Sequence, residues 1–424
     1  MNTEELRIAA AAYGTPTYIF DVREVETRIR LLRSLLPEGT GLCFAVKANP
    51  FLIPYVADMV DRLEVCSPGE YEICIQEQIA PEKIVVSGVN KTYESMKRIL
   101  SYSKGTGIYT IESEEHAKIL RTLAEKNHMQ LSALIRLSSG NQFGVDAETF
   151  IRLAKEVQES PYLTLAGVHY YAGTQKRQSK LEKEMDTLAA FAGTFEAETG
   201  TRLPELEYGA GMKVSYFVND SEKDQRESEP EPQIQALAEK LRTCDAYGKK
   251  TIELGRFLVS MSGYYLTRVM DVKRTAQPGF VILDGGIHQI NYYGWMMGMK
   301  QPEIKVLAEK DGDDCILLEH GGADGKSECS LPENSDAGEM FHLCGSLCTV
   351  NDVLARDVTL HNPEKGDVIC FKRCGAYAAT EGMAMFLSRE LPQVLICRTD
   401  GKIEKLRDRV ETYPFHGGGN WNRM

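Results

Sequence analysis

The sequence predicts an α/β protein made of a parallel (β/α)8 barrel, or TIM barrel, followed by a mostly β domain. Between about residues 25 and 265, short apolar runs alternate with amphipathic stretches, as in consecutive βα units. After about residue 265, short strand-like runs separated by turn residues replace this alternation. The length of 424 residues allows a barrel of about 250 residues and a second domain.

Eight apolar runs are the candidate barrel strands, which is the number that closes such a barrel. They lie at residues 41–46, 63–66, 83–87, 107–111, 133–137, 165–170, 206–208 and 250–253. Between them, stretches such as 25–36, 68–78, 113–126 and 147–159 have the apolar spacing of amphipathic helices.

We therefore place the barrel at residues 25–265 and expect residues 266–424 to form the β domain. Its candidate strands lie at residues 264–272, 280–283, 315–319, 367–371 and 393–398. Two polar stretches stand out. Residues 219–232 are expected to form a solvated insertion, and the acidic, glycine-rich residues 308–338 an exposed hairpin or loop.

Composition excludes several classes of protein. The net charge of −12 disfavours binding to nucleic acid or to anionic membranes. No apolar run approaches the roughly 20 residues of a spanning helix, and the first residues lack the pattern of a signal peptide, so we expect a cytoplasmic protein. Eleven cysteines without C-x-x-C pairs predict neither a disulfide framework nor a metal site.

Lys47 ends the first candidate strand, directly after a short apolar run. Burial there would penalise the ammonium form and lower the pKa of the side chain. A neutral lysine amine can form a Schiff base with an aldehyde cofactor. An isolated lysine is more often a surface residue with a buried stem, so this interpretation depends on the groups that follow.

Further chemical groups follow later strands, where a barrel places its catalytic residues. The turn at residues 209–211, Gly-Ala-Gly, lets backbone N–H groups approach a phosphate. Arg256, next to Gly255, could add a charged contact. Glu253 ends the eighth strand, and a protonated pyridine nitrogen would pair with this buried carboxylate. Tyr171 could lie against a cofactor ring.

Two segments of the second domain add candidates. Cys348 lies in the run at residues 344–352, and a thiol can donate a proton if its pKa lies near the working pH. Tyr377, in the run at residues 375–377, could donate to a phosphate. Each of these groups also has an ordinary explanation in a turn, a salt bridge or core packing, so the combination carries the argument.

Together these segments resemble the fold-type III pyridoxal-phosphate decarboxylases, the group of diaminopimelate and ornithine decarboxylases, from about residue 17 to residue 389. Several motifs carry the resemblance in order. They are FAVKAN at 44–49 (the cofactor-lysine motif), EVCSPGE at 64–70 (the second-strand motif), QFG at 142–144 (the Lys-Phe-Gly element), and the C-terminal motifs at 345–352 and 375–377.

The resemblance implies an alanine-racemase-like arrangement in which residues 1–24 join the β domain, and a head-to-tail homodimer with its sites at the interface. Lys47 would hold pyridoxal phosphate as a Schiff base, Glu253 would stabilise the cofactor as an electron sink, and Cys348 would protonate Cα in the partner's site. The implied cofactor contacts are Lys47, Glu64, Tyr171, Thr174, Gly209, Gly211, Glu253, Gly255, Arg256 and Tyr377. The expected substrate contacts are His288, Thr349 and Asp352.

Four departures from the family pattern bear on the substrate. Tyr171 replaces the second histidine of the family's His-x-His-x-Gly-Ser motif. The stretch between Arg136 and Phe143 is short compared with diaminopimelate decarboxylases. No arginine follows Asp-Gly-Gly at residues 284–286, where diaminopimelate decarboxylases recognise the distal carboxylate. Thr349 stands where an acidic residue usually binds a distal ammonium, and losing such a charged hydrogen bond costs roughly 1.5–3 kcal/mol. We therefore expect an amino acid with a modified distal end.

The run Leu-Cys-Thr at residues 347–349 and the Gly-Thr-Gln at 173–175 are similar to decarboxylases of specialised metabolism. Those enzymes act on carrier-protein-tethered glutamate or on citrate–amino-acid conjugates, so the expected partner is an amino-acid conjugate or an acyl-carrier protein. The alternatives are a diaminopimelate, lysine or ornithine decarboxylase and an alanine-racemase-like racemase. The segment from Cys348 to Asp352 favours decarboxylation over racemisation.

Overall fold

The computed structural model describes residues 1–274, 277–292, 298–307 and 338–417. The predicted strand at 315–319 and residues 308–337 of the predicted loop lie outside this part of the chain. The chain forms two compact units, one of Val25–Val214 with Glu222–Val259 and one of Met1–Glu24, Ser215–Ser221 and Ser260–Met424.

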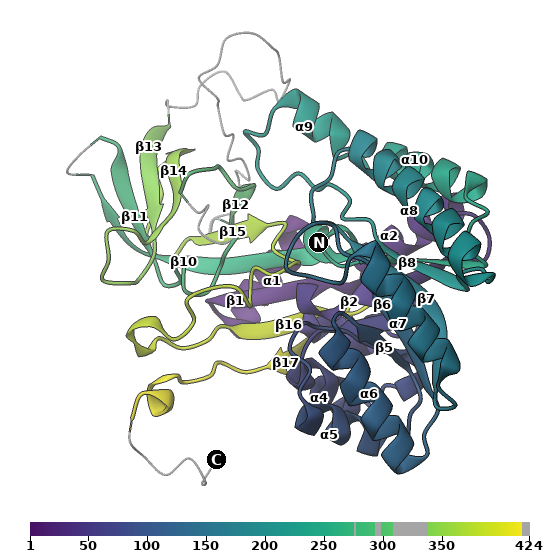
Figure 1. The fold of residues 1–424 in the computed structure, drawn as a ribbon. Coiled ribbons are helices and arrows are strands. Elements are labelled where there is room, and N and C mark those ends of the chain that lie inside the picture. The colour runs from purple at the N-terminus through teal and green to yellow at the C-terminus, as the bar shows by residue number, and fades with distance from the viewer. Residues whose placement is uncertain (275–276, 293–297, 308–337, 418–424) are drawn as a thin grey trace. The chain divides into compact units, whose positions relative to one another are not determined.

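The first unit contains a closed parallel barrel in the order β2-β3-β4-β5-β6-β7-β8-β9, which confirms the predicted fold class (Figure 1). Each strand overlaps one of the eight predicted runs. The strands are β2 (Gly41–Ala45), β3 (Arg62–Val65), β4 (Ile84–Val86), β5 (Ile108–Ile111), β6 (Leu131–Arg136), β7 (Leu163–Tyr171), β8 (Glu205–Gly209) and β9 (Lys249–Leu254).

Helices alternate with these strands, and several begin at a polar side chain that accepts a hydrogen bond from the first turn. Ser67, Thr92, Ser113 and Asp146 cap α4, α5, α6 and α7 in this way. The helices are α2 (Val22–Leu35), α3 (Ile53–Val56), α4 (Pro68–Gln76), α5 (Tyr93–Ser103), α6 (Glu114–Asn127), α7 (Ala147–Glu159), α8 (Gln178–Thr199), α9 (Glu222–Glu227), α10 (Pro230–Thr243) and α11 (Arg256–Val259).

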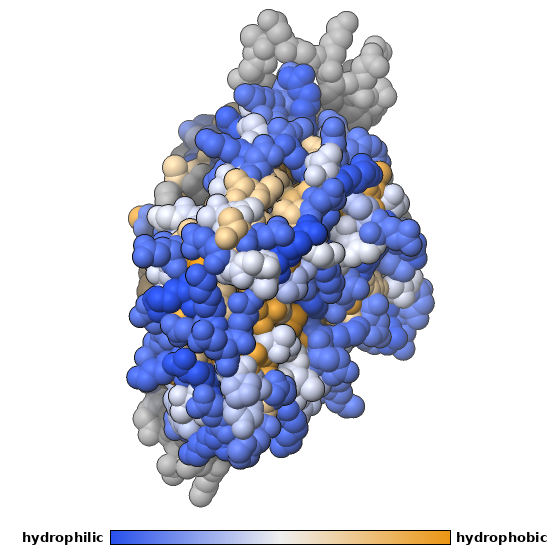
Figure 2. Space-filling model, turned by 45° about the vertical axis from the view of Figure 1, so that its right-hand side comes forward, coloured by the Kyte–Doolittle hydropathy of each residue, from blue (hydrophilic) through white to orange (hydrophobic). Residues whose placement is uncertain are grey.

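The polar stretch at residues 219–232 contains the short helix α9, none of whose residues is buried, and the first turn of α10. Pro230 stands in that first turn, where its missing N–H costs no helical hydrogen bond. On the face drawn in Figure 2, hydrophilic residues predominate and hydrophobic side chains show as smaller patches between them. In the described part of the chain, no helix has both the length and the apolar composition needed to cross a membrane.

The second unit is built on a nine-stranded sheet with the path β14-β13-β11-β10-β1-β16-β17, to which β15 adds on β10 and β12 on β15. On it, helix α1 (Thr3–Tyr13) buries Leu6 and Ala9 against a core that includes Ile19 and Leu266. The strands are β1 (Thr17–Asp21), β10 (Gly263–Lys273), β11 (Gly279–Leu283), β12 (Ile304–Leu307), β13 (Glu339–Cys344), β14 (Val353–Leu360), β15 (Val368–Lys372), β16 (Gln393–Cys397) and β17 (Ile403–Arg407).

The register of β7 depends on a glycine. Next to an irregularity in the pairing of β6 with β7, Gly167 adopts a φ of +149°. A Cβ atom there would lie 2.0 Å from the backbone oxygen of Glu205 on β8, which is far inside van der Waals contact. The close approach of the two strands therefore requires glycine.

We expect Gly167→Ala to destabilise the barrel by about 1–3 kcal/mol or more, because the added methyl group overlaps backbone that cannot move independently. Thermal unfolding followed by circular dichroism measures the effect. The matched control is Gly193→Ala in α8, where a Cβ meets nothing within 4 Å, so it should leave stability unchanged or raise it by up to about 1 kcal/mol. Equal midpoints for the two variants would contradict the assigned contact.

Candidate active site

Lys47 leaves the C-terminal end of the barrel. Strand β2 ends at Ala45, and the chain turns into a short 3-10 helix, Val46–Ala48, whose flanking residues Val46 and Ala48 are buried. The lysine side chain between them remains 36% exposed. Its amine is therefore held at one place by buried neighbours while staying accessible to a small molecule.

Two carboxylates flank the Lys47 amine. Lys47 Nζ donates a hydrogen bond to Glu64 Oε2 at 3.1 Å and lies 3.9 Å from Glu253 Oε1. Glu64 is on β3 and Glu253 on β9, the two strands that pair with β2 in the barrel. The pairing of β2 with β9 that closes the barrel thus brings Glu253 next to Lys47 and Glu64, which lie far from it in the sequence.

Glu64 is an anion over the whole physiological pH range. Burial raises the pKa of its carboxyl group, but the positive charges of Lys47 and His169 outweigh burial and lower the pKa to about 2. The side chain is only 2% exposed, so little solvent screens these interactions. A permanently ionised carboxylate beside the amine gives this end of the barrel a fixed negative charge.

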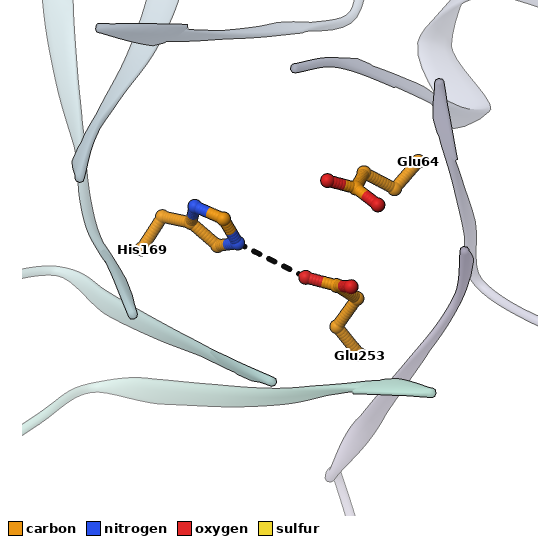
Figure 3. Close-up of side chains that lie close together, drawn as sticks. All are labelled: Glu64, His169 and Glu253. Atoms are coloured by element: carbon orange, nitrogen blue, oxygen red, sulfur yellow. Dashed lines mark hydrogen bonds and ion pairs between the residues drawn. The ribbon is translucent and has the colours of Figure 1, made fainter. Parts of the chain in front are cut away.

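His169 supports Glu253 from β7. His169 Nε2 lies 3.0 Å from Glu253 Oε2, as the close-up shows (Figure 3). Burial lowers the pKa of this imidazole, but the hydrogen bond and the charge of Glu253 outweigh burial and raise the pKa above its ordinary value. Two carboxylates and an imidazole can also bind a metal, but in this structure the Lys47 amine already meets both carboxylates.

Glycines bring backbone and an aromatic ring close to this amine. The ring centroid of Tyr171 lies 5.7 Å from Lys47 Nζ. A Cβ on Gly209 would lie 2.5 Å from Tyr171 Cδ2, and a Cβ on Gly255 would lie 2.9 Å from the Cβ of Ala48. Both glycines are therefore needed for the turns after β8 and β9 to pack against the site.

Other predicted cofactor contacts lie on the same loops. Gly211 has a φ of +58°, and a Cβ there would lie 2.1 Å from the oxygen of Gly173. Arg256 is the first residue of α11. Thr174 is exposed in the loop after β7. The structure thus brings most of the predicted cofactor contacts to one end of the barrel, while their roles stay predictions.

The predicted substrate contacts and Tyr377 lie in the other compact unit. Cys348 is exposed, and Tyr377 adopts a φ of +64°. His288 is 1% exposed, and neither of its ring nitrogens has a hydrogen-bond partner among the described residues. Burial, helped by the charge of Arg389, lowers the pKa of His288 to about 4, so the imidazole is neutral near pH 7.

Asp352 has a structural contact that the sequence did not predict. Its Oδ1 accepts the N–H of Ile287 at 2.8 Å, and its Oδ2 accepts the N–H of Leu347 at 2.7 Å. The side chain is 2% exposed, and burial raises its pKa although both N–H groups oppose the change. Asp352 therefore shapes the loop that carries Cys348, and a direct contact with substrate stays a prediction.

Sequence reasoning missed several buried cations near the C-terminal ends of barrel strands. Lys91 donates to the oxygen of Gly88 at 2.6 Å, and burial lowers its pKa to about 8. Arg136 pairs with Glu112 at 3.0 Å. Lys176, which is 3% exposed, follows the Gly-Thr-Gln motif directly. Its place next to that motif was the only signal, because a lysine in a polar loop normally predicts exposure.

A lysine amine between two carboxylates at the C-terminal end of a (β/α)8 barrel is typical of enzymes that bind a carbonyl compound as a Schiff base. Residues 22–260 match the family model described as "Pyridoxal-dependent decarboxylase, pyridoxal binding domain". The chain belongs to this family. It is a pyridoxal-phosphate-dependent amino-acid decarboxylase of fold type III.

Curated relatives cover nearly the whole chain. The diaminopimelate decarboxylase of Pseudomonas aeruginosa is 26% identical over 392 residues, 87% of this chain and 84% of that protein. The L-glutamyl-[BtrI acyl-carrier protein] decarboxylase of Niallia circulans is 24% identical over 445 residues, 96% and 94% of the two chains. The 2-[(L-alanin-3-ylcarbamoyl)methyl]-2-hydroxybutanedioate decarboxylase of Staphylococcus aureus is 24% identical over 414 residues, 92% and 96% of the two chains.

Solved structures share the fold. Diaminopimelate decarboxylase from Helicobacter pylori, complexed with L-lysine, superposes with a TM-score of 0.77 at 21% identity, covering 97% of this chain and 98% of that chain. The residues of the barrel fit pyridoxal phosphate. They offer an accessible amine for its aldehyde, a buried carboxylate for its ring nitrogen, an aromatic ring, and a glycine turn in which side chains would collide.

Lys47→Ala should remove the visible absorbance that pyridoxal phosphate gains when it is bound to a lysine amine, because the variant lacks the amine that forms the Schiff base. The variant should keep the circular dichroism spectrum of the wild type, since the side chain is only partly buried. Lys183→Ala, which removes an exposed lysine on α8, is the matched control and should keep the absorbance. A Lys47→Ala protein that also keeps it would disprove the assignment.

Proposed function

We propose that this decarboxylase acts on an amino acid whose distal end is modified, rather than on free meso-diaminopimelate. The observation that carries the proposal is Thr349, a neutral residue directly after Cys348, where the family usually has an acidic one. Two of the relatives named above act on substrates with altered distal ends, one on glutamate joined to a carrier protein and one on a citrate-like conjugate. An acyl-carrier protein is therefore one candidate partner.

His288 supports the same proposal. It lies in the segment where diaminopimelate decarboxylases carry an arginine for the distal carboxylate, and it is a neutral imidazole near pH 7. Buried polar groups are normally hydrogen-bonded, and neither ring nitrogen of His288 has a partner in the described part of the chain. A distal hydroxyl, amide or carboxyl group of a substrate would give it one.

The residues of the chain have distinct proposed roles. When bound, pyridoxal phosphate supplies an electron sink for the pair released as the Cα–carboxylate bond breaks. Lys47 would hold its aldehyde carbon, and Glu253, oriented by His169, would hold the ring nitrogen. The carboxyl group leaves as carbon dioxide, and the Cys348 thiol would deliver the proton that replaces it on Cα. The phosphate would lie against Thr174, Gly209, Gly211, Gly255, Arg256 and Tyr377.

Cys348 would serve the barrel of a partner subunit, so the proposal includes a homodimer with shared sites. Cys348 is exposed and therefore able to meet another chain. A cytoplasmic location stays a prediction. The second candidate function is decarboxylation of diaminopimelate or of lysine or ornithine, and the diaminopimelate decarboxylases among the relatives favour it.

Carbon dioxide release tests the substrate directly. We expect purified protein with pyridoxal phosphate to decarboxylate a citryl- or carrier-linked amino acid and to leave free meso-diaminopimelate, lysine, ornithine, arginine and glutamate nearly untouched. Thr349→Glu should raise turnover of free lysine or ornithine by about tenfold or more through a charged hydrogen bond to the distal ammonium. Val350→Glu, at a neighbouring position that is 91% exposed, is the matched control.

Robust turnover of free meso-diaminopimelate by the wild type, at a kcat/KM above roughly 10⁴ M⁻¹s⁻¹, would contradict the proposed substrate class. A lysine or ornithine turnover that Thr349→Glu and Val350→Glu change equally would show that Thr349 does not face the distal group.

Subunit mixing tests the shared site. Lys47→Ala and Cys348→Ala homodimers should each lose most activity, by about 10²–10⁴-fold for the proton donor. When the two are mixed under conditions that exchange subunits, some sites would combine an intact Lys47 with an intact Cys348, and activity should return. Cys344→Ala, which alters a half-buried cysteine, is the control. No recovery in proven heterodimers would place both residues in one subunit's site.

A further inference from the structure

We propose that Lys176 is a positioning residue that holds the Gly209–Gly211 turn in the orientation that binds the cofactor phosphate. The inference rests on the proposed function, because it takes the phosphate to lie at this turn. It concerns a residue that neither the sequence motifs nor the family match assign.

Lys176 holds the carbonyl groups of Gly209 and Gly211, the two residues next to Ala210. Its Nζ donates to the oxygen of Gly209 at 2.9 Å, and its own backbone N–H donates to the oxygen of Gly211 at 2.9 Å. In a trans peptide the N–H points opposite to the carbonyl group of the same unit. The N–H of Ala210, which shares a peptide unit with the Gly209 carbonyl, is therefore directed away from Lys176.

The loop that carries Lys176 is itself joined to the chain after the turn. Gln175 Oε1 accepts the N–H of Val214, and Gln175 Nε2 donates to the oxygen of Val214, both at 2.7 Å. A Cβ on Gly211 would meet the oxygen of Gly173 at 2.1 Å and Lys176 Cε at 3.0 Å. The two loops pack without space between them, so moving Lys176 would move the turn.

Lys176 acts through orientation rather than through net charge. Its Nζ lies 2.7 Å from Glu184 Oε2, which also accepts the hydroxyl of Tyr208 at 2.8 Å. Burial lowers the pKa of Lys176 below its ordinary value although Glu184 opposes the change. The rings of Tyr208 and Tyr171 lie 5.1 and 5.6 Å from Nζ. The pair is neutral as a whole, so losing it should affect the phosphate through the turn.

A purely structural role for Lys176 makes a different prediction. If the buried pair only stabilised the barrel, its loss would weaken the binding of every cofactor analogue to the same extent. If Lys176 positions the turn, its loss should weaken binding of pyridoxal phosphate and spare pyridoxal, which lacks the phosphate but keeps the aldehyde and the ring nitrogen. The ratio of the two dissociation constants separates these roles.

The experiment titrates the full-length protein, freed of cofactor, with pyridoxal phosphate and with pyridoxal, and follows binding by absorbance. We expect Lys176→Met to raise the Kd for pyridoxal phosphate about tenfold or more and to change the Kd for pyridoxal less than about twofold. Lys183→Met, which alters an exposed lysine on the same helix as Glu184, should change neither. An unchanged Kd for pyridoxal phosphate, or equal losses for both ligands, would overturn the inference.

Removing one member of a buried ion pair can destabilise a fold, so a second variant controls for unfolding caused by the unpaired Glu184 carboxylate. Lys176→Met combined with Glu184→Gln leaves no unpaired charge and keeps an acceptor for the Tyr208 hydroxyl. It should show the same selective loss, and wild-type affinity would overturn the inference. A wild type that binds pyridoxal as tightly as pyridoxal phosphate would overturn the phosphate assignment as well. If the wild type prefers pyridoxal phosphate to pyridoxal and both variants keep this preference, the role of Lys176 is overturned while the phosphate assignment stands.

Discussion

Buried charge is the constraint on which the barrel depends. A carboxylate taken out of water costs several kcal/mol unless cations or donors meet it. At the C-terminal end, the Lys47 amine and His169 meet Glu64 and Glu253. At the other end, Arg62 Nη1 meets Glu205 at 2.6 Å and Glu207 at 2.9 Å. At each end, removing one partner of the network would therefore leave a buried charge unpaired.

The two networks differ in their access to other molecules, and that difference places the function. Arg62 is 12% exposed and already paired with two carboxylates, so the network of Arg62, Glu205 and Glu207 serves the fold. The Lys47 side chain is 36% exposed, so within the network at the C-terminal end of the barrel it is the group that a small molecule can reach. A bound cofactor would take over the contacts of this amine with Glu253 and Tyr171, which makes the barrel end a preformed site.

The barrel strands and the main charged residues could be predicted because each depends on local pattern. Buried parallel strands are continuous apolar runs, and Lys47 directly follows one of the predicted runs while Glu253 ends another. Strands β1, β12, β13, β14 and β17 were not among the predicted strands. β17 lacks the signal because none of its residues is buried, whereas β1 is buried throughout and its short apolar run was overlooked. Lys176 could not be predicted, because its burial depends on Glu184 and Tyr208, which lie on other elements. The backbone contacts of Asp352 depend equally on tertiary structure.

The central claim is that Lys47, held between Glu64 and Glu253, is the lysine that carries the cofactor. The most direct test is borohydride reduction of the protein loaded with pyridoxal phosphate, which fixes the cofactor covalently on the lysine that holds it, followed by peptide mass spectrometry. Our account predicts the pyridoxyl group on Lys47 in the peptide that spans the end of β2. A modified Lys91 or Lys176 with Lys47 unmodified would contradict it.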